Sequence, residues 1–321
     1  MPELLALLDL GSNAARFVLA RINPGVGYRV LQKERIQTRL GDGRAGELPP
    51  DAVALTLSSV SGFLERLGIN GAPLRLMAVA TAAVRDAQNR DCLLQVLKER
   101  DGADVRLLSD REEARLGALA AMRHLPIQEG VIGDLGGGSL QLTQVRAGRI
   151  TSAAGVPVGA VRMTRRFLRG DPPTPREVRA LRDLVRDHLL GVLPAARRGD
   201  ELLGLGGTVR TLARMHLAAQ TSPRRKRHAL CLTLADVTAL RERIEALPVR
   251  RRRHIRGLKA ERADIIVAGA ITVEEVMRFG GYGALTVCKG GVRDGILWQE
   301  TFNGRGFSDR LLDDGQRVHQ P

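Results

Sequence analysis

A short phrase is written twice in this chain, each time directly after an apolar run. The first copy, Asp-Leu-Gly-Ser-Asn at residues 9–13, follows the apolar residues 4–8. The second copy, Asp-Leu-Gly-Gly-Gly-Ser at residues 134–139, follows Val131 and Ile132. Each copy predicts a strand that ends in an acid and a glycine-rich turn, and the alternating apolar run after each turn predicts a second strand.

The two predicted turns have the chemistry of a phosphate site. Glycine has no Cβ, so backbone amides can crowd a phosphate group. The acid before each turn, Asp9 or Asp134, can hold Mg²⁺, which prefers a carboxylate, waters and phosphate oxygens. Each aspartate could instead only cap its turn, but two copies favour the functional interpretation. Two such turns would clamp one phosphate chain from both sides through Gly11, Ser12, Asn13, Gly136, Gly137, Gly138 and Ser139.

Length and the order of the predicted elements indicate a two-domain α/β protein. The chain has 321 residues, and one domain commonly holds about 100–200 residues. Strands and helices alternate, and the order restarts near Val131, which suggests an internal duplication. We expect an N-terminal lobe over residues 1–125, a C-terminal lobe over residues 126–302 and a poorly ordered tail over residues 303–321.

Local patterns predict the elements that carry these turns. Apolar residues at helical spacing predict helices at residues 51–67, 83–100, 109–124, 176–193, 209–219, 234–246 and 263–279, and another after residue 291. Apolar runs bounded by turn residues predict further strands at residues 29–32, 74–80, 105–108, 202–205 and 285–288. Asp9 and Asp134 would then lie at the carboxyl edges of sheets, where α/β proteins usually bind ligands.

A third glycine turn follows the predicted strand at residues 202–205. Gly206, Gly207 and Thr208 precede a predicted helix, so their N–H groups would lie at its positive end and suit an anion. A similar pair, Gly290-Gly291, precedes the last helix, where a plain turn is an equally good interpretation.

Two glutamates and one arginine are further candidates. Glu112 and Glu113 open the predicted helix at residues 109–124, where glutamates usually form a capping box or oppose the helix dipole. An acid placed where two lobes meet can instead take a proton from water as a general base. Arg85 either pairs with a neighbouring acid or binds phosphate, and composition does not decide between the two.

The net charge of +15 comes from 50 basic and 35 acidic residues, and only five of the basic residues are lysine. A protein with this net charge attracts polyanions. The arginine excess could equally reflect a GC-rich genome. Basic runs at residues 224–227 and 250–253 are either solvated loops or rim charge that captures long polyanions. Aromatic residues do not interleave with these runs, so nucleic-acid binding is not expected.

Other function classes find little support. Cys92, Cys231 and Cys288 lie far apart in apolar stretches, which predicts buried, reduced thiols rather than a metal or redox pair. The six histidines do not cluster along the sequence, so no metal site of the His/Cys type is expected. No basic region with a cleavage site precedes residues 4–8, and that run is too short to span a membrane. We therefore expect a cytoplasmic protein without a membrane segment.

Blocks of residues along the chain resemble the Ppx/GppA phosphatases, the exopolyphosphatase and guanosine pentaphosphate phosphohydrolase family of the actin-like ATPase superfamily. The blocks keep the family's order and cover nearly all of the chain to about residue 299. Together they are specific, although none would be alone. They are residues 8–13, 79–90, 108–116, 133–139, 155–162, 204–208, 261–264 and 289–295.

The resemblance implies two ribonuclease-H-like lobes with the active site in the cleft between them. It implies Glu113 as the base that activates the attacking water, with Glu112 as the neighbour that could exchange roles with it. By the same resemblance, Arg85 binds phosphate near the point of attack. Asp134 helps to hold Mg²⁺ (or Mn²⁺) and water.

The glycine turns match the family's phosphate cradles, and Arg262, which lies in one matching block, is assigned to substrate binding. One position departs from the pattern. The family usually has Gly-Gly-Gly-Ser-Thr-Glu, whereas residues 136–141 are Gly-Gly-Gly-Ser-Leu-Gln. Gln141 thus replaces an acid that commonly supports metal or water, and an amide carries no charge. Metal binding should be weaker or depend more on Asp134 and Asp9.

The expected function is metal-dependent hydrolysis of a terminal phosphoanhydride, with polyphosphate or guanosine pentaphosphate as substrate. The first rival is a sensor that binds such molecules without turnover, which Gln141 permits. The second rival is a kinase of the same superfamily, and a nucleic-acid protein ranks last. A homodimer is left open.

Overall fold

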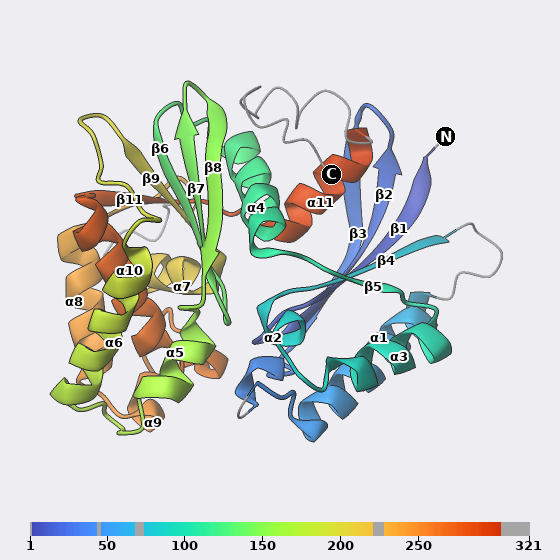
Figure 1. Cartoon of the computed structure of the whole chain (residues 1–321), viewed down its shortest axis with the longest axis horizontal. Helices are drawn as coiled ribbons and strands as arrows, with labels where there is room; N and C mark the ends of the chain where they lie inside the picture. Colours follow the sequence, from blue (N-terminus) through green and yellow to red (C-terminus); the bar gives the residue numbers. More distant parts are fainter. Residues whose placement is uncertain (1, 44–45, 68–73, 221–227, 303–321) are drawn as a thin grey trace.

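The computed structural model of the chain describes residues 2–43, 46–67, 74–220 and 228–302. It has two lobes, each built on one mixed β-sheet with helices packed against it (Figure 1). Among these residues no helix is long and apolar enough to cross a membrane. The expected tail at residues 303–321 and the basic run at residues 224–227 lie outside the described residues.

The first sheet has five strands in the order β3-β2-β1-β4-β5. The central strand β1 (Glu3–Leu10) pairs antiparallel with β2 (Ala15–Asn23) and parallel with β4 (Leu74–Ala80). The edge strands are β3 (Gly27–Ile36) and β5 (Val105–Leu107). The first copy of the repeated phrase therefore ends β1, at the carboxyl edge of this sheet.

The second sheet repeats this arrangement and adds one edge strand. Its order is β10-β11-β9-β6-β7-β8. The strands β6, β7 and β8 pair antiparallel, as β1, β2 and β3 do, and β6 pairs parallel with β9 on its other edge. The second copy of the phrase ends β6, the counterpart of β1. The strands are β6 (Gly130–Leu135), β7 (Leu140–Arg146), β8 (Arg149–Val156), β9 (Glu201–Leu205), β10 (Cys231–Thr233) and β11 (Ala284–Val287).

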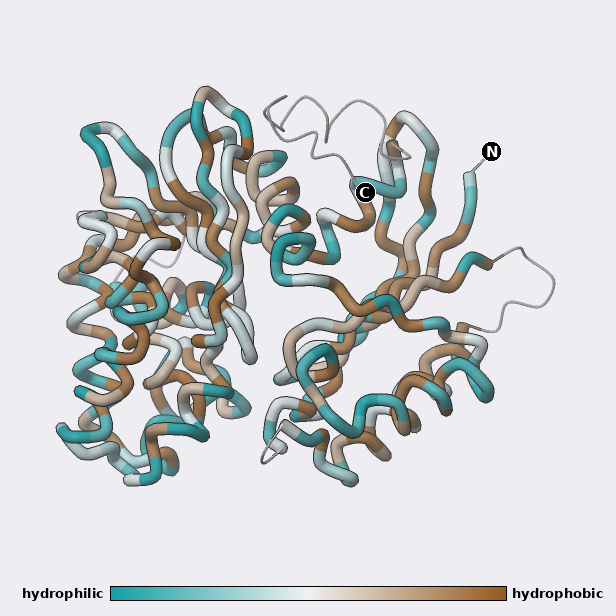
Figure 2. The backbone as a smooth tube through the Cα atoms, in the orientation of Figure 1, coloured by the Kyte–Doolittle hydropathy of each residue, from teal (hydrophilic) through white to brown (hydrophobic). Residues whose placement is uncertain are grey.

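The central strand β1 is buried on both faces. Its side chains alternate between the two faces, so neighbouring residues lie in different apolar cores. Leu8 packs with Phe17 and Phe63 against α1 (Pro50–Leu67) and α3 (Arg90–Asp101), whereas Leu7 lies in a separate core on the opposite face. Figure 2 shows the apolar residues concentrated along the strands and along the helix faces that meet them.

Six further helices pack around the second sheet (Figure 1). They are α5 (Ala160–Phe167), α6 (Pro175–Leu189), α7 (Gly206–Ala219), α8 (Leu234–Glu245), α9 (Val249–Arg252) and α10 (Ile266–Gly280). Short 3₁₀ turns lie at Leu40–Asp42 and Ala260–Arg262. These elements build one contiguous apolar core in the second lobe.

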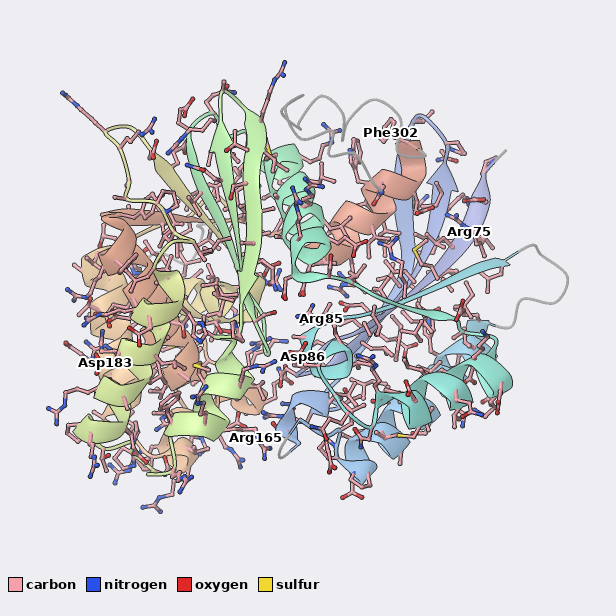
Figure 3. The ribbon with its side chains drawn as sticks, in the orientation of Figure 1. Arg75, Arg85, Asp86, Arg165, Asp183 and Phe302 are labelled. Atoms are coloured by element: carbon pink, nitrogen blue, oxygen red, sulfur yellow. The ribbon has the colours of Figure 1, made fainter. Side chains whose placement is uncertain are left out.

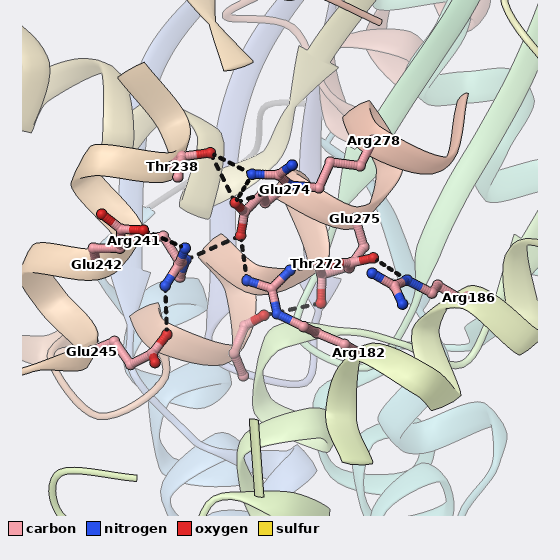
Figure 4. A network of polar contacts seen from close by, with 11 residues as sticks. Arg182, Arg186, Thr238, Arg241, Glu242, Glu245, Thr272, Glu274, Glu275 and Arg278 are labelled. Atoms are coloured by element: carbon pink, nitrogen blue, oxygen red, sulfur yellow. Dashed lines mark hydrogen bonds and ion pairs between the residues drawn. The ribbon is translucent and has the colours of Figure 1, made fainter. Parts of the chain in front are cut away.

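A buried charge network joins α6, α8 and α10 (Figure 4). Glu274 and Glu275 on α10 are fully buried, and arginines from the neighbouring helices surround them. Burial alone would raise the pKa of Glu274, but hydrogen bonds from Thr238, Arg182 and Arg278 lower it to about 2. The network therefore keeps Glu274 ionised inside the lobe and orients α6, α8 and α10 relative to one another.

Two helices cross between the lobes. The helix α4 (Asp110–His124) follows β5 of the first sheet, yet its Ala118 and Ala121 pack with Ile132 of the second sheet. The last helix, α11 (Val292–Phe302), follows the second sheet, yet its Ile296 and Leu297 pack on β1 and β2 of the first. Figure 1 shows α4 and α11 side by side between the two sheets. The last helix of the expected C-terminal lobe thus covers the N-terminal sheet.

The structure differs from the sequence prediction at five segments. The helix expected at residues 83–100 is two helices, α2 (Ala82–Arg85) and α3, separated by a turn. The Asn89 side chain bonds both backbone groups of Leu48, and this anchors the turn to a neighbouring loop. The strands β8 and β10 and the helices α5 and α9 were not predicted.

The cysteine prediction is correct for one of three residues. Cys288 is buried, whereas Cys92 and Cys231 are exposed. Cys92 lies on the outer face of α3, and Cys231 lies on β10, the edge strand of its sheet. The expectation of burial is wrong for these two, because an edge strand and an outer helix face leave side chains to solvent.

Candidate active site between the lobes

A cavity of about 130 Å³ lies between the lobes, at the carboxyl ends of β1 and β6. Both lobes contribute to its wall, and so do the first residues of α7 and the turn before α11. Most of the residues that the sequence singled out line it: Asp9, Gly11, Ser12, Asn13, Glu113, Asp134, Gly136, Gly137, Gly138, Ser139, Gly206, Gly207 and Arg262. The cavity also takes in Gly290 and Gly291, for which a plain turn was an equal alternative.

The two glycine turns pack directly against each other. A Cβ on Gly137 would stand 3.0 Å from the Cβ of Ser12, and a Cβ on Gly138 would stand 2.7 Å from the Ser12 Oγ. Only glycine allows this approach, which brings backbone groups of both lobes to one space. The α5 amides of Ala160 and Val161 donate to the turn's carbonyl oxygens at 3.1 and 2.9 Å, so α5 holds the turn in place.

Glu113 lies in the first turn of α4, with only 8% of the residue exposed. Its Oε2 atom has no hydrogen-bond partner among the described residues, and Arg85 Nη1 lies 3.7 Å from it. Burial first, and the Asp134 carboxylate second, raise the pKa of Glu113 to about 8 against the opposing effect of Arg85. A buried carboxyl group that has an oxygen without a hydrogen bond, and a pKa near neutrality, is suited to act as a general base.

Glu112 has a different role. Its carboxylate accepts hydrogen bonds from the Ser109 backbone N–H at 2.9 Å and from Ser109 Oγ at 2.8 Å, which completes a capping box. It also lies 3.5 Å from Arg106, and it does not line the cavity. The capping box fixes the first turn of α4, from which the Glu113 side chain reaches the cavity. Of the two glutamates, the geometry therefore favours Glu113.

Asp134 is enclosed between two glycines. A Cβ on Gly206 would stand 3.0 Å from one of its carboxylate oxygens, and a Cβ on Gly117 would stand 3.4 Å from the other. Gly117 lies one helical turn after Glu113 on α4, so the carboxyl groups of Glu113 and Asp134 border the same face of α4. Burial raises the pKa of Asp134, and the guanidinium of Arg210 opposes that shift.

Four cations that the sequence did not single out for the site line the cavity: Arg16, Arg210, Lys289 and Arg293. Arg16 Nη1 lies 3.3 Å and Arg293 Nε 3.5 Å from the Asp9 carboxylate. Arg16 follows the first glycine turn by three residues and Arg293 follows Gly290-Gly291 by two, so closeness to the turns was the available signal. With Arg262, five cations therefore line the cavity beside four acids, Asp9, Glu113, Asp134 and Asp294.

Arg262 is the most unusual of these cations. Burial first, and then the nearby guanidinium groups of Arg35 and Arg16, lower its pKa to about 9. No acidic side chain lies within ion-pair distance of Arg262 in the part of the chain that the structure describes. Its guanidinium lies against Gly207, where a Cβ would collide with it. A buried guanidinium without an anionic partner is suited to bind an incoming anion.

Arg85 stands behind the cavity wall rather than in it. Its guanidinium donates to Asp110 at 2.8 Å, to the Leu108 carbonyl oxygen at 2.9 Å and to Asp86 at 3.2 Å. Figure 3 shows Arg85 and Asp86 at the side of the first lobe that faces the second. The two alternatives for Arg85 were an ion pair with a neighbouring acid or a contact with phosphate, and the structure shows ion pairs with Asp86 and Asp110. These pairs hold the Arg85 guanidinium close to Glu113.

Two other sequence candidates lie outside the cavity wall. Gln141 is buried on β7 opposite Asp134, and its Nε2 donates to the Ser139 Oγ at 2.6 Å. Thr208 is buried, and its hydroxyl packs against α10, where a Cβ on Gly269 would stand 2.6 Å from it. Gln141 supports the second turn from behind, and Thr208 anchors the start of α7.

The donor set suits a cation that binds together with a phosphate ligand. Asp9 and Asp134 supply carboxylates, and both polar side-chain atoms of Asn13 are buried without hydrogen-bond partners in the described structure. Among the described residues no group of three or more His, Cys, Asp or Glu side chains is placed to hold a metal. Mg²⁺ commonly binds through one or two carboxylates and completes its shell with water and phosphate oxygens.

Comparison with known proteins points to one family. The model of the Ppx/GppA phosphatase family matches residues 18–303. Exopolyphosphatase 1 of Mycobacterium tuberculosis is 31% identical over 303 residues, which cover 91% of this chain and 87% of that protein. Exopolyphosphatase 2 of the same organism is 30% identical over 310 residues, with 91% and 97% covered. The crystal structure of the Aquifex aeolicus Ppx/GppA family member has a TM-score of 0.78 at 25% identity and covers 95% of this chain and 100% of that one.

Two sheets of matching strand order, with a glycine-lined cavity between them, define a two-lobed α/β protein with the actin-like ATPase fold. The chain belongs to the Ppx/GppA phosphatase family. The resemblance drawn from the sequence motifs and the expected fold class are both confirmed.

Proposed function

We propose that this protein releases terminal phosphate from inorganic polyphosphate in the presence of Mg²⁺ or Mn²⁺, and that guanosine pentaphosphate is a further substrate of the same chemistry. The observation that carries the proposal is the buried carboxyl group of Glu113, whose Oε2 accepts no hydrogen bond from the described residues, at a cavity walled by glycine turns and arginines. The names of the two mycobacterial relatives support polyphosphate as the substrate class.

In this mechanism the ionised form of Glu113 accepts a proton from the attacking water. The main task in phosphoryl transfer is to neutralise charge on the phosphoryl oxygens. Backbone amides of the glycine turns and of the α7 N-terminus, together with Arg16 and Arg262, are placed to do so. Arg85 keeps Glu113 in position from behind the wall.

Asp134 and Asp9 would hold the cation, with the Asn13 side chain as a further oxygen donor. When bound, the cation would neutralise negative charge on the substrate phosphates. Gln141 adds no charge to this set, and its hydrogen bond to Ser139 gives it a supporting role instead. Asp134 and Asp9 would therefore be the main ligands of the metal.

A phosphate-release assay tests the proposal directly. Tripolyphosphate, long-chain polyphosphate and guanosine pentaphosphate would be compared with Mg²⁺, with Mn²⁺ and with a chelator. We expect release from polyphosphate with a divalent cation and none with the chelator. A protein that binds labelled polyphosphate but releases no phosphate under any condition would be the sensor instead. Phosphate transfer to ADP would indicate the kinase.

The raised pKa of Glu113 predicts how activity depends on pH. A base must be ionised to act, so kcat/KM should rise with pH and level off above about 8. A cation beside Asp9 and Asp134 would neutralise carboxylates that raise this pKa, so more Mg²⁺ should shift the rising limb to lower pH. Rates on tripolyphosphate, measured across pH at several Mg²⁺ concentrations, check both points. A profile without a rising limb would contradict the role of Glu113.

A further inference from the structure

The turn that carries Arg262 is held from the other lobe. Gln37 Nε2 and Arg39 Nη2 donate hydrogen bonds to the backbone carbonyl oxygen of Glu261, at 2.8 and 3.2 Å. Arg35 Nη1 donates to the Glu261 carboxylate at 2.8 Å. We call these three residues of the first lobe, Arg35, Gln37 and Arg39, the strap. The strap connects two segments that lie 222 to 226 positions apart in the sequence.

The carbonyl group that the strap holds belongs to the peptide bond between Glu261 and Arg262. A peptide unit is planar, so a bond that fixes its oxygen also limits where the Arg262 Cα can lie. Within the second lobe, the Arg262 N–H donates to the Lys259 carbonyl oxygen at 2.9 Å. Arg252 Nη1 donates to the Ala263 carbonyl oxygen at 3.2 Å. Hydrogen bonds from both lobes therefore set the point from which the Arg262 side chain enters the cavity.

The strap also occupies the acidic groups next to Arg262. Glu261 precedes Arg262 and Asp264 follows it by two residues. Arg35 holds the Glu261 carboxylate. Arg39 Nη2 lies 2.7 Å from the Asp264 carboxylate. A guanidinium that is paired with a carboxylate has to give up that pair before it binds phosphate. Because both flanking acids are engaged elsewhere, the buried guanidinium of Arg262 stays available for an anion.

The strap is anchored at the first glycine turn. The Arg39 N–H donates to the Asn13 carbonyl oxygen at 3.4 Å. The Gly41 N–H donates to the Ser12 carbonyl oxygen at 2.7 Å. Arg39 has a φ of 59°, in the left-handed region that residues other than glycine seldom adopt. Such a conformation persists only where the surrounding structure enforces it. The backbone of Arg39 is therefore fixed to the cavity wall of the first lobe, while its side chain holds the turn of Arg262.

We propose that the strap positions Arg262 for substrate binding, by holding its peptide group in place and by keeping its guanidinium free of carboxylate partners. The inference rests on the proposed function, and it adds three residues that do not line the cavity themselves. These residues act through Arg262 rather than by contact with the substrate. Loss of a strap donor should therefore weaken phosphate binding only as long as Arg262 is present.

The test is a double-mutant cycle between Arg39→Gln and Arg262→Gln. It measures the dissociation constant for fluorescent polyphosphate in the presence of a chelator, so that turnover does not interfere. Arg39→Gln alone is expected to raise this constant by about 10-fold, because an ion pair and a charge-assisted hydrogen bond are lost together. In the Arg262→Gln background the same change should have no further effect.

A second variant and a control complete the cycle. Gln37→Met removes the other donor to the Glu261 carbonyl oxygen without a change of charge. It should raise the dissociation constant by about 3-fold, and again only when Arg262 is present. The matched control is Arg29→Gln, which removes one positive charge from an exposed position of β3 outside the strap. It should leave the constant unchanged.

Three outcomes would overturn the inference. They are an unchanged dissociation constant in Arg39→Gln, an equal effect of Arg29→Gln, and effects of Arg39→Gln and Arg262→Gln that add in the double variant. A thermal melt verifies folding, and the cycle with Gln37→Met decides the matter if Arg39→Gln does not fold. If the wild type releases no phosphate with any metal, the proposed function fails. The cycle still shows whether the strap positions Arg262, since it measures binding alone.

Discussion

The substitution Glu113→Gln is expected to lower kcat for phosphate release by roughly 10² to 10⁴, the usual contribution of a general base. Glutamine fills the same space but cannot accept the proton from water. The raised pKa means that the wild-type side chain is largely neutral at neutral pH, so the substitution changes the local charge little. Binding of labelled polyphosphate should therefore stay close to wild type while turnover is lost, and the two measurements together check the assignment.

The neighbouring residue provides a matched control. Glu112→Gln also exchanges a glutamate for its amide in the first turn of α4, and glutamine can still close a capping box with Ser109. This variant should keep wild-type turnover. Wild-type turnover in Glu113→Gln would show that the base lies elsewhere, and loss of turnover in Glu112→Gln alone would exchange the two roles.

The second large effect is expected from Asp134→Asn. Asparagine fits the space between Gly117 and Gly206 but removes the negative charge that would hold a cation. We expect kcat to fall by at least about 100-fold, since metal ions supply several kcal/mol of charge stabilisation. The Mg²⁺ concentration needed for half-maximal rate should rise as well. A Mg²⁺ titration of the phosphate-release rate, combined with a thermal melt that verifies folding, measures both effects.

The control for Asp134→Asn is Asp183→Asn, because Asp183 is exposed on α6 and points away from the first lobe in Figure 3. It should alter neither the rate nor the Mg²⁺ titration. A large drop in kcat for Asp134→Asn with an unchanged Mg²⁺ titration would mean that Asp134 acts on something other than the cation.

The parts of the site that were predictable are those whose signal is local. An apolar run, an acid and glycines are contiguous in the sequence, so the ends of β1 and β6 and their turns could be placed without a structure. The choice between Glu112 and Glu113 could be made only in part from local sequence. The spacing of Ser109 and Glu112 is a capping-box pattern, which the structure confirms, but only the fold shows that Glu113 reaches the cavity.

What the sequence did not reveal depends on tertiary contacts. Arg210 and Lys289 reach the cavity from elements far apart in the chain, and although each lies close to a glycine turn, only the fold shows that they meet in one cavity. The missed strand β8 has small residues where apolar ones were expected, because α4 packs closely on it. A Cβ on its Gly155 would stand 2.6 Å from the Cβ of Asp110. Close packing by a distant helix thus removed the pattern that would have identified the strand.

The exchange of α4 and α11 between the lobes has a consequence for the chain as a whole. Leu5 and Leu7 of the first sheet are covered by Ile296 and Leu297 of α11, which the ribosome adds only after the whole second sheet. The N-terminal half, once it leaves the ribosome, therefore carries an incompletely covered apolar sheet face until α11 has been synthesised. Although the strand order is duplicated, each lobe thus takes part of its core from a helix that follows the strands of the other lobe.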